Sequence, residues 1–264
     1  KGHPLISIII VSKNDLDNLA KCIDSILRNS TYDNFEIIIV NNGTTDPKQK
    51  KYYQLIEQIK YVKVCRCDGG IVNAYDYGVN ISKGEYVVFL RSMISIVESQ
   101  WMEELLMYAQ RSDVGAVGAK IYNTDDTVKE CGLIIGGGEG GIVMRSHEGV
   151  PKSSGGYMGR LFYAQNVSAV SDLCMMVKRK KFESVHGFDE RFEEKYYDVD
   201  LCLDLLEKGY YNLVNPFVTL IKRKSIENKD NKVDRKMLIH KKENIIEKGD
   251  KFYNKNLSHT ISRI

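Results

Sequence analysis

Short, unbroken runs of apolar residues recur through the first half of the chain and predict buried strands. The runs are rich in β-branched residues and end in polar turns, which is typical of strands covered on both faces. Helical patterns separate them, and the first of these places Leu19, Ile23 and Ile26 on one face after Asp15 as a candidate cap. The expected strands are residues 5–11, 36–40, 61–65 and 86–90, and the later helices are residues 48–59 and 72–82. This alternation predicts an α/β fold with a parallel, doubly wound sheet over about the first 120 residues.

The pattern of apolar residues changes in the second half of the chain. Residues 132–141 are dense in glycine and show little helical periodicity. A helix that Gly209 ends is expected just before the last strand, and a Lys-rich helix follows that strand. The expected elements are strands 114–120 and 213–221, extended segments 155–163 and 167–177, a short helix around Phe182 and Val185, and helices 198–208 and 232–247, the last with Met237, Leu238, Ile245 and Ile246 as its apolar stripe. No internal repeat or low-complexity linker interrupts this series, so we expect one continuous domain.

Composition supports a globular protein in a reducing compartment. Apolar residues make up 43% of the chain, which is enough for a sizeable core. Cys65 and Cys67 have no second Cys or His pair at metal spacing, so we expect the six cysteines to be free, mostly buried thiols. No apolar run is long enough to cross a bilayer, and no secretory signal is present at the start. The opening residues 1–4 are typical of a cut point in a longer protein or of a tag remnant. We expect a cytoplasmic location.

Charge is unevenly distributed along the chain. Residues 222–264 contain 13 Lys and Arg against 6 Asp and Glu, a net charge of +7, whereas residues 1–221 contain 25 and 29, a net charge of −4. A basic segment of this kind binds anionic lipid headgroups or an acidic partner, or it is a solvated helical face. We keep these interpretations open, so peripheral contact with the inner face of the plasma membrane is one expectation. The segment has few aromatic residues and no recognised motif, so nucleic acid is not expected as a partner.

Residues 84–101 contain a predicted strand, and the residues that follow this strand are the most informative about function. Arg91, Ser92 and Met93 follow the buried run 86–90, and Ser99 is the candidate cap of a helix that begins near residue 101. In open α/β sheets, ligands bind beyond the carboxyl ends of the strands. A metal-bound diphosphate at this place would need carboxylate oxygens, but the chain offers a cation, a hydroxyl and a thioether.

Several segments, in this order and spacing, resemble glycosyltransferase family 2, the inverting GT-A enzymes that transfer a sugar from a nucleotide diphosphate donor. The opening strand I-S-I-I-I-V-S-K-N, the turn E-I-I-I-V-N-N-G-T-T-D and the helix Y-D-V-D-L-C-L-D-L-L-E-K-G are similar to segments of this family. The ending G-D-K-F-Y-N-K-N-L-S is similar to one found in its rhamnosyltransferase-like members, which build bacterial surface polysaccharides. The matching segments are residues 6–14, 19–27, 36–46, 70–78, 84–90, 166–182, 187–192, 197–209 and 249–258.

The resemblance implies a GT-A fold, which is Rossmann-like with a mostly parallel central sheet and helices on both faces. One domain would cover residues 1–221, with a nucleotide-side half of about 1–120 and an acceptor-side half of about 121–221. Residues 222–264 would form a basic helical extension packed on the same domain.

The resemblance places the family's metal ligands on residues that do not suit a hard cation. The family's Asp-x-Asp falls on Arg91-Ser92-Met93, and its His near the end of the last strand falls on Lys222. We therefore expect no metal site and no cofactor, with a UDP- or TDP-sugar as donor only if the protein is active. A literal Asp-x-Asp occurs at Asp198-Val199-Asp200, but it aligns with the helix that carries the base.

The donor-side positions implied by the resemblance have changed as well. Asn41 replaces the Asp that contacts uracil, Lys13 replaces a Tyr, and Tyr75 stands where an Arg or Asn often points at the donor. The expected donor site, degenerate by this comparison, consists of Ser12, Lys13, Asn41, Tyr75, Asp76, Arg91, Ser92 and Met93, with Lys222 and Arg223 as candidate cations for a diphosphate.

The acceptor side retains a candidate base. Asp198 aligns with the family's catalytic carboxylate, although the neighbouring Glu is Tyr197 here. An alternative is that Asp198 is only an acidic residue favoured by the dipole of the helix start. Asp200 is expected to have a structural role by bonding the backbone, and Asp172, where the family has a small residue, is explained only by pairing with a nearby Lys or Arg.

Two functional hypotheses follow. The first is a catalytically degenerate glycosyltransferase-like domain that acts as a scaffold, regulator or glycan-binding partner in bacterial surface-polysaccharide or glycoprotein assembly, beside an active glycosyltransferase or flanking domain and a glycan or glycoprotein acceptor. The alternative is an active, metal-independent inverting transferase in which Asp198 is the base and Arg91, Lys222 and Arg223 hold the diphosphate.

Overall fold

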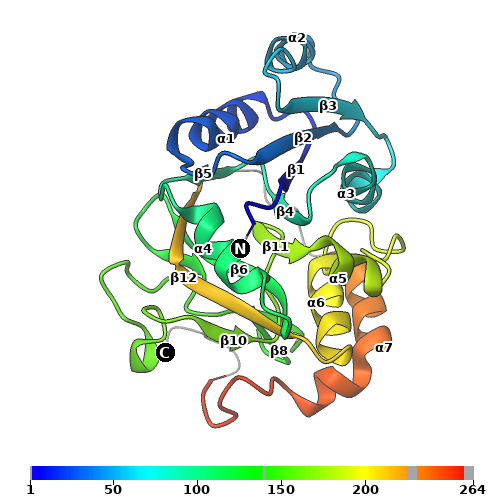
Figure 1. Ribbon diagram of the computed structural model, residues 1–264. Coiled ribbons are helices and arrows are strands. Elements are labelled where there is room, and N and C mark those ends of the chain that lie inside the picture. The colour runs from blue at the N-terminus through cyan, green and yellow to red at the C-terminus, as the bar shows by residue number, and fades with distance from the viewer. Residues whose placement is uncertain (1, 139–140, 225–230, 259–264) are drawn as a thin grey trace.

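A mixed sheet forms the centre of the molecule (Figure 1). The computed structural model describes residues 2–138, 141–224 and 231–258. Their strands are β1 (Ile6–Ser12), β2 (Phe35–Asn41), β3 (Val62–Arg66), β4 (Tyr86–Leu90), β5 (Ile94–Ile96), β6 (Val114–Asn123), β7 (Val128–Glu130), β8 (Leu133–Ile135), β9 (Val143–Arg145), β10 (Gln165–Val167), β11 (Cys174–Lys178) and β12 (Tyr211–Lys222). Within these residues the main sheet has the order β10-β12-β6-β11-β4-β1-β2-β3, with β5 paired to β12 and β7 to β6, and β8 pairs with β9 separately.

The N-terminal strands form the parallel part of the sheet. β1 pairs in parallel with β2 and β4, and β2 pairs in parallel with β3. β11 is inserted antiparallel between β4 and β6, whereas β6 and β12 run parallel. Because the carboxyl ends of β1, β2 and β4 share one edge, the loops that follow them meet there. The α/β class with a mostly parallel central sheet, predicted from the sequence, is confirmed.

Helices cover both faces of the sheet. α1, α2 and α4 pack on one face, and α3, α5, α6 and α7 on the other. No helix within the described residues is long and apolar enough to span a bilayer. The helices are α1 (Leu16–Asn29), α2 (Pro47–Ile56), α3 (Gly70–Ile81), α4 (Trp101–Ala109), α5 (Arg179–Ser184), α6 (Tyr197–Glu207) and α7 (Lys232–Lys248), with a 3₁₀ turn η1 (Tyr157–Gly159).

Strand β4 shows why its sequence is apolar without interruption. Val87 and Phe89 belong to the core beneath α3 and α6, whereas Val88 and Leu90 belong to the core beneath α1 and α4. All four side chains are fully buried. Burying each apolar side chain contributes about 1.5–3 kcal/mol. The burial of β4 therefore holds the position of the residue that follows it, Arg91.

Two local predictions from the sequence were wrong. Ser99 is not the cap of α4, since that position is Gln100, and the Ser99 carbonyl accepts hydrogen bonds from Thr31 instead. The stretch 155–163 is not extended, because left-handed backbone at Gly156 and Gly159 folds it into η1 and its flanking turns.

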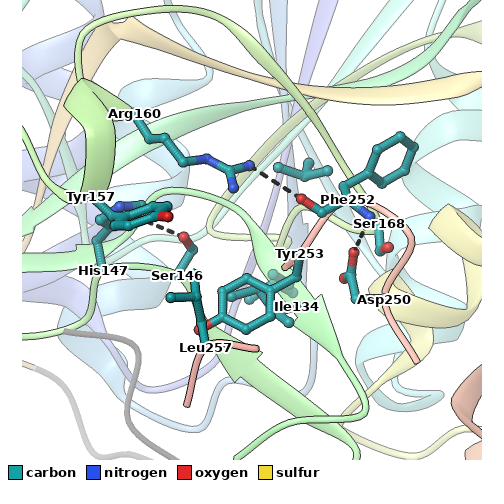
Figure 2. Close-up of a pocket in the computed structure, with 12 residues that line it drawn as sticks. Ile134, Ser146, His147, Tyr157, Arg160, Ser168, Asp250, Phe252, Tyr253 and Leu257 are labelled. Atoms are coloured by element: carbon teal, nitrogen blue, oxygen red, sulfur yellow. Dashed lines mark hydrogen bonds between the residues drawn. The ribbon is translucent and has the colours of Figure 1, made fainter. Parts of the chain in front are cut away.

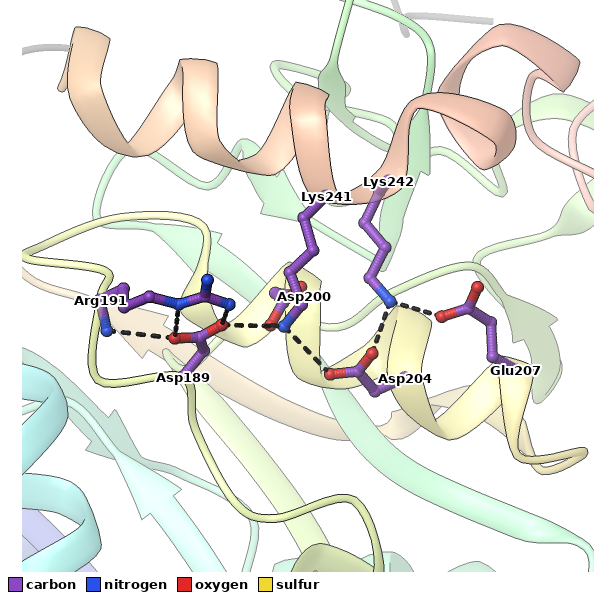
Figure 3. A network of polar contacts seen from close by, with 7 residues as sticks. All are labelled: Asp189, Arg191, Asp200, Asp204, Glu207, Lys241 and Lys242. Carbon is purple, nitrogen blue, oxygen red and sulfur yellow. Dashed lines mark hydrogen bonds and ion pairs between the residues drawn. The ribbon is translucent and has the colours of Figure 1, made fainter.

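The C-terminal helix α7 packs against α6 through a buried side chain and a set of ion pairs. Leu238 is buried in the core, and Met237, Ile245 and Ile246 pack around the same cluster, as the predicted apolar stripe requires. Figure 3 shows the ion pairs, in which Lys241 and Lys242 of α7 point at acidic side chains of α6. The pairs join Lys241 to Asp189, Asp200 and Asp204, and Lys242 to Asp204 and Glu207.

Candidate functional site

The candidate site lies where β4 ends beside the start of β11. In this antiparallel pair Leu90 faces Cys174, and the Arg91 N–H donates to the Leu173 carbonyl at 3.3 Å. The register therefore places Arg91, the first residue after β4, next to Asp172, which comes shortly before β11. Helix α6 begins beside them, so two strand ends and one helix N-terminus build the site.

Arg91, Asp172 and Tyr197 form one connected polar group. Arg91 Nη1 lies 3.2 Å from Asp172 Oδ2, and both side chains are largely buried, with exposed fractions of 24% and 13%. The Tyr197 hydroxyl donates to the same Asp172 oxygen. The Asp172 backbone N–H in turn donates to Asp198 Oδ2 at 3.0 Å. The guanidinium charge of Arg91 is thus balanced inside the protein by a carboxylate that itself contacts α6.

This polar group lies on the wall of a cavity of about 310 Å³. Cationic side chains reach the wall from several elements, and acidic side chains come from α6, from the loop before it and from the turn before β11. The lining residues are Arg91, Met93, Leu133, Val143, Arg145, Ser171, Asp172, Leu173, Glu194, Lys195, Tyr196, Tyr197, Asp198, Val199 and Lys222. The cavity is large enough for a small molecule, and polar groups make up more of its wall than in most small-molecule sites, which favours a polar ligand.

Asp198 is the titratable group of the cavity with the environment of a base. Burial, and after it the nearby charge of Asp172, raise the pKa of Asp198 to about 7. Its Oδ1 accepts the Val199 N–H at 2.8 Å and its Oδ2 accepts the Asp172 N–H, so the carboxylate is fixed in position. A positioned carboxylate with a pKa near neutrality is suited to take a proton from a hydroxyl group.

The matches to known proteins identify the family. The model described as glycosyl transferase family 2 matches residues 7–185. The chain belongs to glycosyl transferase family 2. Uncharacterized protein y4gI of Sinorhizobium fredii is 34% identical over 230 residues, which cover 85% of this chain and 25% of that protein. O-antigen biosynthesis protein RfbC of Myxococcus xanthus is 33% identical over 215 residues, which cover 79% of this chain and 16% of that protein. The family 2 domain therefore spans a quarter or less of the length of these relatives.

Solved structures establish the fold of this family 2 domain. GalNAc-T7 with UDP, GalNAc and Mn²⁺ matches with a TM-score of 0.69 at 15% identity, covering 85% of this chain and 44% of that chain. The mannosyltransferase PcManGT from Pyrobaculum calidifontis, in complex with GDP-Man and Mn²⁺, matches with a TM-score of 0.62 at 14% identity, covering 83% and 56%. The predicted GT-A fold is confirmed.

Both solved neighbours contain Mn²⁺, but the side chains of this domain at the end of β4 do not fit a divalent ion. Arg91 is cationic, and the Ser92 hydroxyl donates to Asp15 Oδ2 at 2.8 Å. Met93 offers only a thioether, which is too soft a ligand for such an ion. No group of three or more His, Cys, Asp or Glu that could hold a metal occurs in residues 2–138, 141–224 and 231–258.

The predicted donor residues on β1 and β2 support the local turns. Ser12 Oγ accepts from Gln49 at 2.7 Å, and Asn41 Oδ1 accepts the Thr44 N–H at 2.8 Å. Lys13 is exposed between them. None of these side chains lines the 310 Å³ cavity. The structure thus gives Ser12 and Asn41 structural partners at the edge of the sheet.

Tyr75 and Asp76 of α3 lie beneath the cavity instead of in it. The Tyr75 ring is fully buried, with its centroid 5.3 Å from that of Phe89 and 6.1 Å from that of Tyr197. Burial raises the pKa of Asp76 to about 7, and its Oδ1 accepts the Phe188 N–H at 3.5 Å. Neither residue is among those that line the cavity, so neither points at a ligand there.

Lys222 and Arg223 at the end of β12 lie in different environments. Lys222 lines the cavity together with Arg91. Arg223 donates to the backbone carbonyls of Asn18 at 2.8 Å and Ser92 at 2.9 Å, and also to the Ser95 hydroxyl. It is absent from the cavity wall. The structure therefore does not bring Arg223 together with the other two cations.

The residues that sequence reasoning undervalued are Asp172 and Tyr197. Each stood out as a departure from the family's pattern, but only the structure shows that Asp172 contacts the third departure, Arg91, and that Tyr197 contacts Asp172 in turn. Asp200 was expected to bond the backbone, but its carboxylate pairs with Lys241 Nζ at 2.6 Å. The signal in the sequence was Asp172 itself, a charged residue where the family has a small one. It indicated that a cation lies nearby but not which one.

Proposed function

We propose that this family 2 domain is a non-catalytic binding or scaffold partner in bacterial surface-polysaccharide or glycoprotein assembly. The observation that carries the proposal is the contact of Arg91 and Tyr197 with Asp172 at the place where the family binds its metal. A metal-bound diphosphate needs free carboxylates at this place, whereas Asp172 is engaged with a cation and a hydroxyl, and Asp15 accepts the Ser92 hydroxyl.

The cationic alternative to a metal is weakened by the same contacts. A diphosphate would have to compete with Asp172 for Arg91, and Asp172 would then remain in a mostly buried place without its cation. Arg223 cannot turn toward the cavity without breaking its hydrogen bonds to Asn18 and Ser92. Lys222 is the remaining candidate of the three.

A glycan is a suitable ligand for the cavity. Carboxylates such as Asp198 and Glu194 and the ring of Tyr196 lie on one wall, and groups of these kinds bind sugar hydroxyls and sugar faces. The relative RfbC is called an O-antigen biosynthesis protein, which supports a setting in surface-glycan assembly. An active glycosyltransferase or a flanking domain would be the partner that supplies the chemistry.

Calorimetric titration with UDP, TDP and GDP, each with and without Mn²⁺, tests the proposal. We expect no binding by the natural chain under any of these conditions. A matched variant combines Arg91→Asp, Met93→Asp and Asp172→Gly, which restores the family's carboxylates and removes the internal partner. Gain of Mn²⁺-dependent binding by this variant would locate the loss in these residues, whereas micromolar binding by the natural chain would contradict the proposal.

A second candidate is an active, metal-independent inverting transferase with Asp198 as base. Its support is the position of Asp198 on the cavity wall and its pKa of about 7, since a general base is most effective when its pKa lies near the working pH. Transfer or hydrolysis of a nucleotide diphosphate sugar in EDTA, rising with pH through about 7 and lost in Asp198→Asn, would establish this function. A rate in Asp198→Asn equal to that of the natural chain would exclude it.

We also propose a cytoplasmic location, with peripheral membrane contact through the basic C-terminal segment. Lys241 and Lys242 are engaged with α6 and so do not add to a lipid-facing surface. Lys232, Lys236 and Lys248 of α7 are exposed and could face anionic headgroups. Co-sedimentation with vesicles that contain or lack anionic lipid distinguishes contact from no contact.

A further inference from the structure

We propose that Asp234 and Asp250 are positioning residues that hold two separate stretches of the cavity wall in place. Both belong to residues 231–258, which we call the C-terminal clasp. The clasp does not line the cavity itself, but it hydrogen-bonds the backbone of the segments that do. This inference concerns the shape of the cavity and does not depend on which ligand the cavity takes.

The first anchor is Asp234 in the first turn of α7. Its side chain is fully buried, and its two oxygens accept the backbone N–H groups of Glu193, Glu194 and Lys195 at 3.0, 2.9 and 2.9 Å. Asn231 caps the same turn by accepting the N–H of Asp234 at 3.2 Å. Three N–H groups that would otherwise lack a partner in this loop are satisfied by one carboxylate.

The loop that Asp234 holds leads directly into the site. Glu194 and Lys195 line the cavity, and the next residue, Tyr196, has left-handed backbone with a φ of 65°. This conformation is unfavourable for a bulky side chain, so it persists only where neighbouring contacts hold it. Tyr197 follows at the start of α6 and donates to Asp172. Asp234 therefore fixes the point from which Tyr197 and Asp198 enter the cavity.

The second anchor is Asp250, just after α7. Its Oδ2 accepts the Ile135 N–H of β8 at 2.8 Å, and its Oδ1 accepts the Phe252 N–H at 2.8 Å. Figure 2 shows Asp250 and Phe252 beside Ile134, with Tyr253 nearby, around a small cavity of about 20 Å³. The adjoining Leu133 lines both this small cavity and the 310 Å³ cavity.

β8 carries the second stretch of the wall. It pairs with β9, in which Val143 faces Ile135 and Arg145 faces Leu133, and these β9 residues also line the large cavity. Between the two anchors, the ion pairs of Lys241 and Lys242 fasten α7 to α6 (Figure 3). The clasp thus connects the β8–β9 wall and the loop before α6 through one continuous segment.

Hydrogen exchange of single amides, measured by NMR in the whole chain, tests the proposal with three variants. Asp234→Asn removes one acceptor oxygen beneath the loop, and Asp250→Asn does the same beneath β8. Lys242→Met is the matched control, because it breaks ion pairs to Asp204 and Glu207 and leaves both anchors intact. The reporters are two amides that do not bond the clasp. The Asp172 N–H donates to Asp198 Oδ2, and the Leu133 N–H donates to the Ala169 carbonyl.

We expect Asp234→Asn to speed exchange at Asp172, and Asp250→Asn to speed it at Leu133, by about tenfold or more, since each loses a hydrogen bond to a charged group. The amides of β1 should exchange as before. Unchanged exchange at Asp172 and Leu133 would overturn the proposal, because the anchors would then hold only their own neighbours. The proposal would also be overturned if the exchange rates of all amides rose together, in proportion to the loss of melting temperature, as they should in Lys242→Met. The two variants report separately, so the loss of folding in one leaves the other decisive.

Discussion

Arg91 Nη1 lies 3.2 Å from Asp172 Oδ2, across the antiparallel pair that β4 forms with β11. By the sequence resemblance, the two residues stand where the family has a metal ligand and a small residue. Tyr197, which stands where the family has a Glu, contacts the same carboxylate. Three departures that seem unrelated along the sequence are therefore one polar group in space. Because an unpaired charge in a largely buried place is costly, Arg91 and Asp172 each depend on the other for their place in the fold.

Arg91→Met should destabilise the fold by about 3 kcal/mol, because it leaves the Asp172 carboxylate largely buried without its cation. Adding Asp172→Ala should recover much of this loss, since the stranded charge is then removed as well. The free energy of unfolding from urea titration of both single variants and the double variant gives the coupling between them.

The control for this cycle is Arg111→Met. Arg111 pairs with Asp113 at 2.7 Å, but both side chains are about half exposed, so the loss should be far smaller. Equal losses in Arg91→Met and Arg111→Met would mean that burial of the Arg91 pair does not matter, and additive single losses in the double variant would mean that the pair is not coupled.

Arg223→Lys should lower the free energy of unfolding by about 2 kcal/mol, because one ammonium cannot reproduce the bonds that Arg223 donates from three nitrogens. Nε bonds Asn18 Oδ1, Nη1 bonds the Ser95 hydroxyl, and Nη2 bonds the carbonyls of Asn18 and Ser92. These bonds tie α1 and the loop after β4 to the end of β12. Lys224→Met, at the exposed next residue, is the matched control. A variant that keeps full stability in thermal melts but alters nucleotide binding would place Arg223 in the donor site after all.

The sequence was most informative where local pattern and burial agree. The run 86–90 has the bounds of β4 itself, because five consecutive apolar residues can only be accommodated in a strand with cover on both faces. It was least informative where backbone contacts from distant residues decide the outcome. Ser99 has the right chemistry for a cap, but its carbonyl is taken by Thr31, 68 positions earlier. β5 is short and owes its pairing to β12, which no local pattern reveals.

The same limit applies to the candidate site. The resemblance located Arg91, Lys222 and Asp198, and these three do line one cavity. It also suggested Ser12 and Asn41, whose partners belong to turns, and Tyr75, whose ring is buried in the core while its hydroxyl interacts with Arg91. A family motif specifies where a residue lies along a strand or helix, but it does not specify which neighbouring protein groups the side chain bonds.

Gly187→Ala should cost about 1–2 kcal/mol in the free energy of unfolding, and Gly187→Val should cost more. The glycine has left-handed backbone with a φ of +72°, and an added Cβ would lie 3.1 Å from the Phe182 ring and 3.2 Å from Asp76 Oδ1. Gly209→Ala is the control, because its φ of +94° carries the same backbone strain while nothing lies within 4 Å of its Cβ. If melts show equal losses for the two alanine variants, crowding at Gly187 makes no contribution.

Asp198 should make the fold less stable as pH rises from about 4 to about 7. Burial and the charge of Asp172 raise its folded-state pKa to about 7, whereas an Asp in the unfolded chain has a pKa of about 3.9. Between these values the folded protein binds a proton that the unfolded chain has released, so raising the pH favours unfolding. Asp198→Asn cannot titrate, and its melting temperature should therefore fall less between pH 5 and pH 8 than that of the natural chain. Asp126→Asn, which removes an exposed carboxylate, should keep the natural dependence. If Asp198→Asn also keeps the natural pH dependence of the melting temperature, another group binds the proton in the folded state. Asp198 is then already ionised at the pH where a base would have to act.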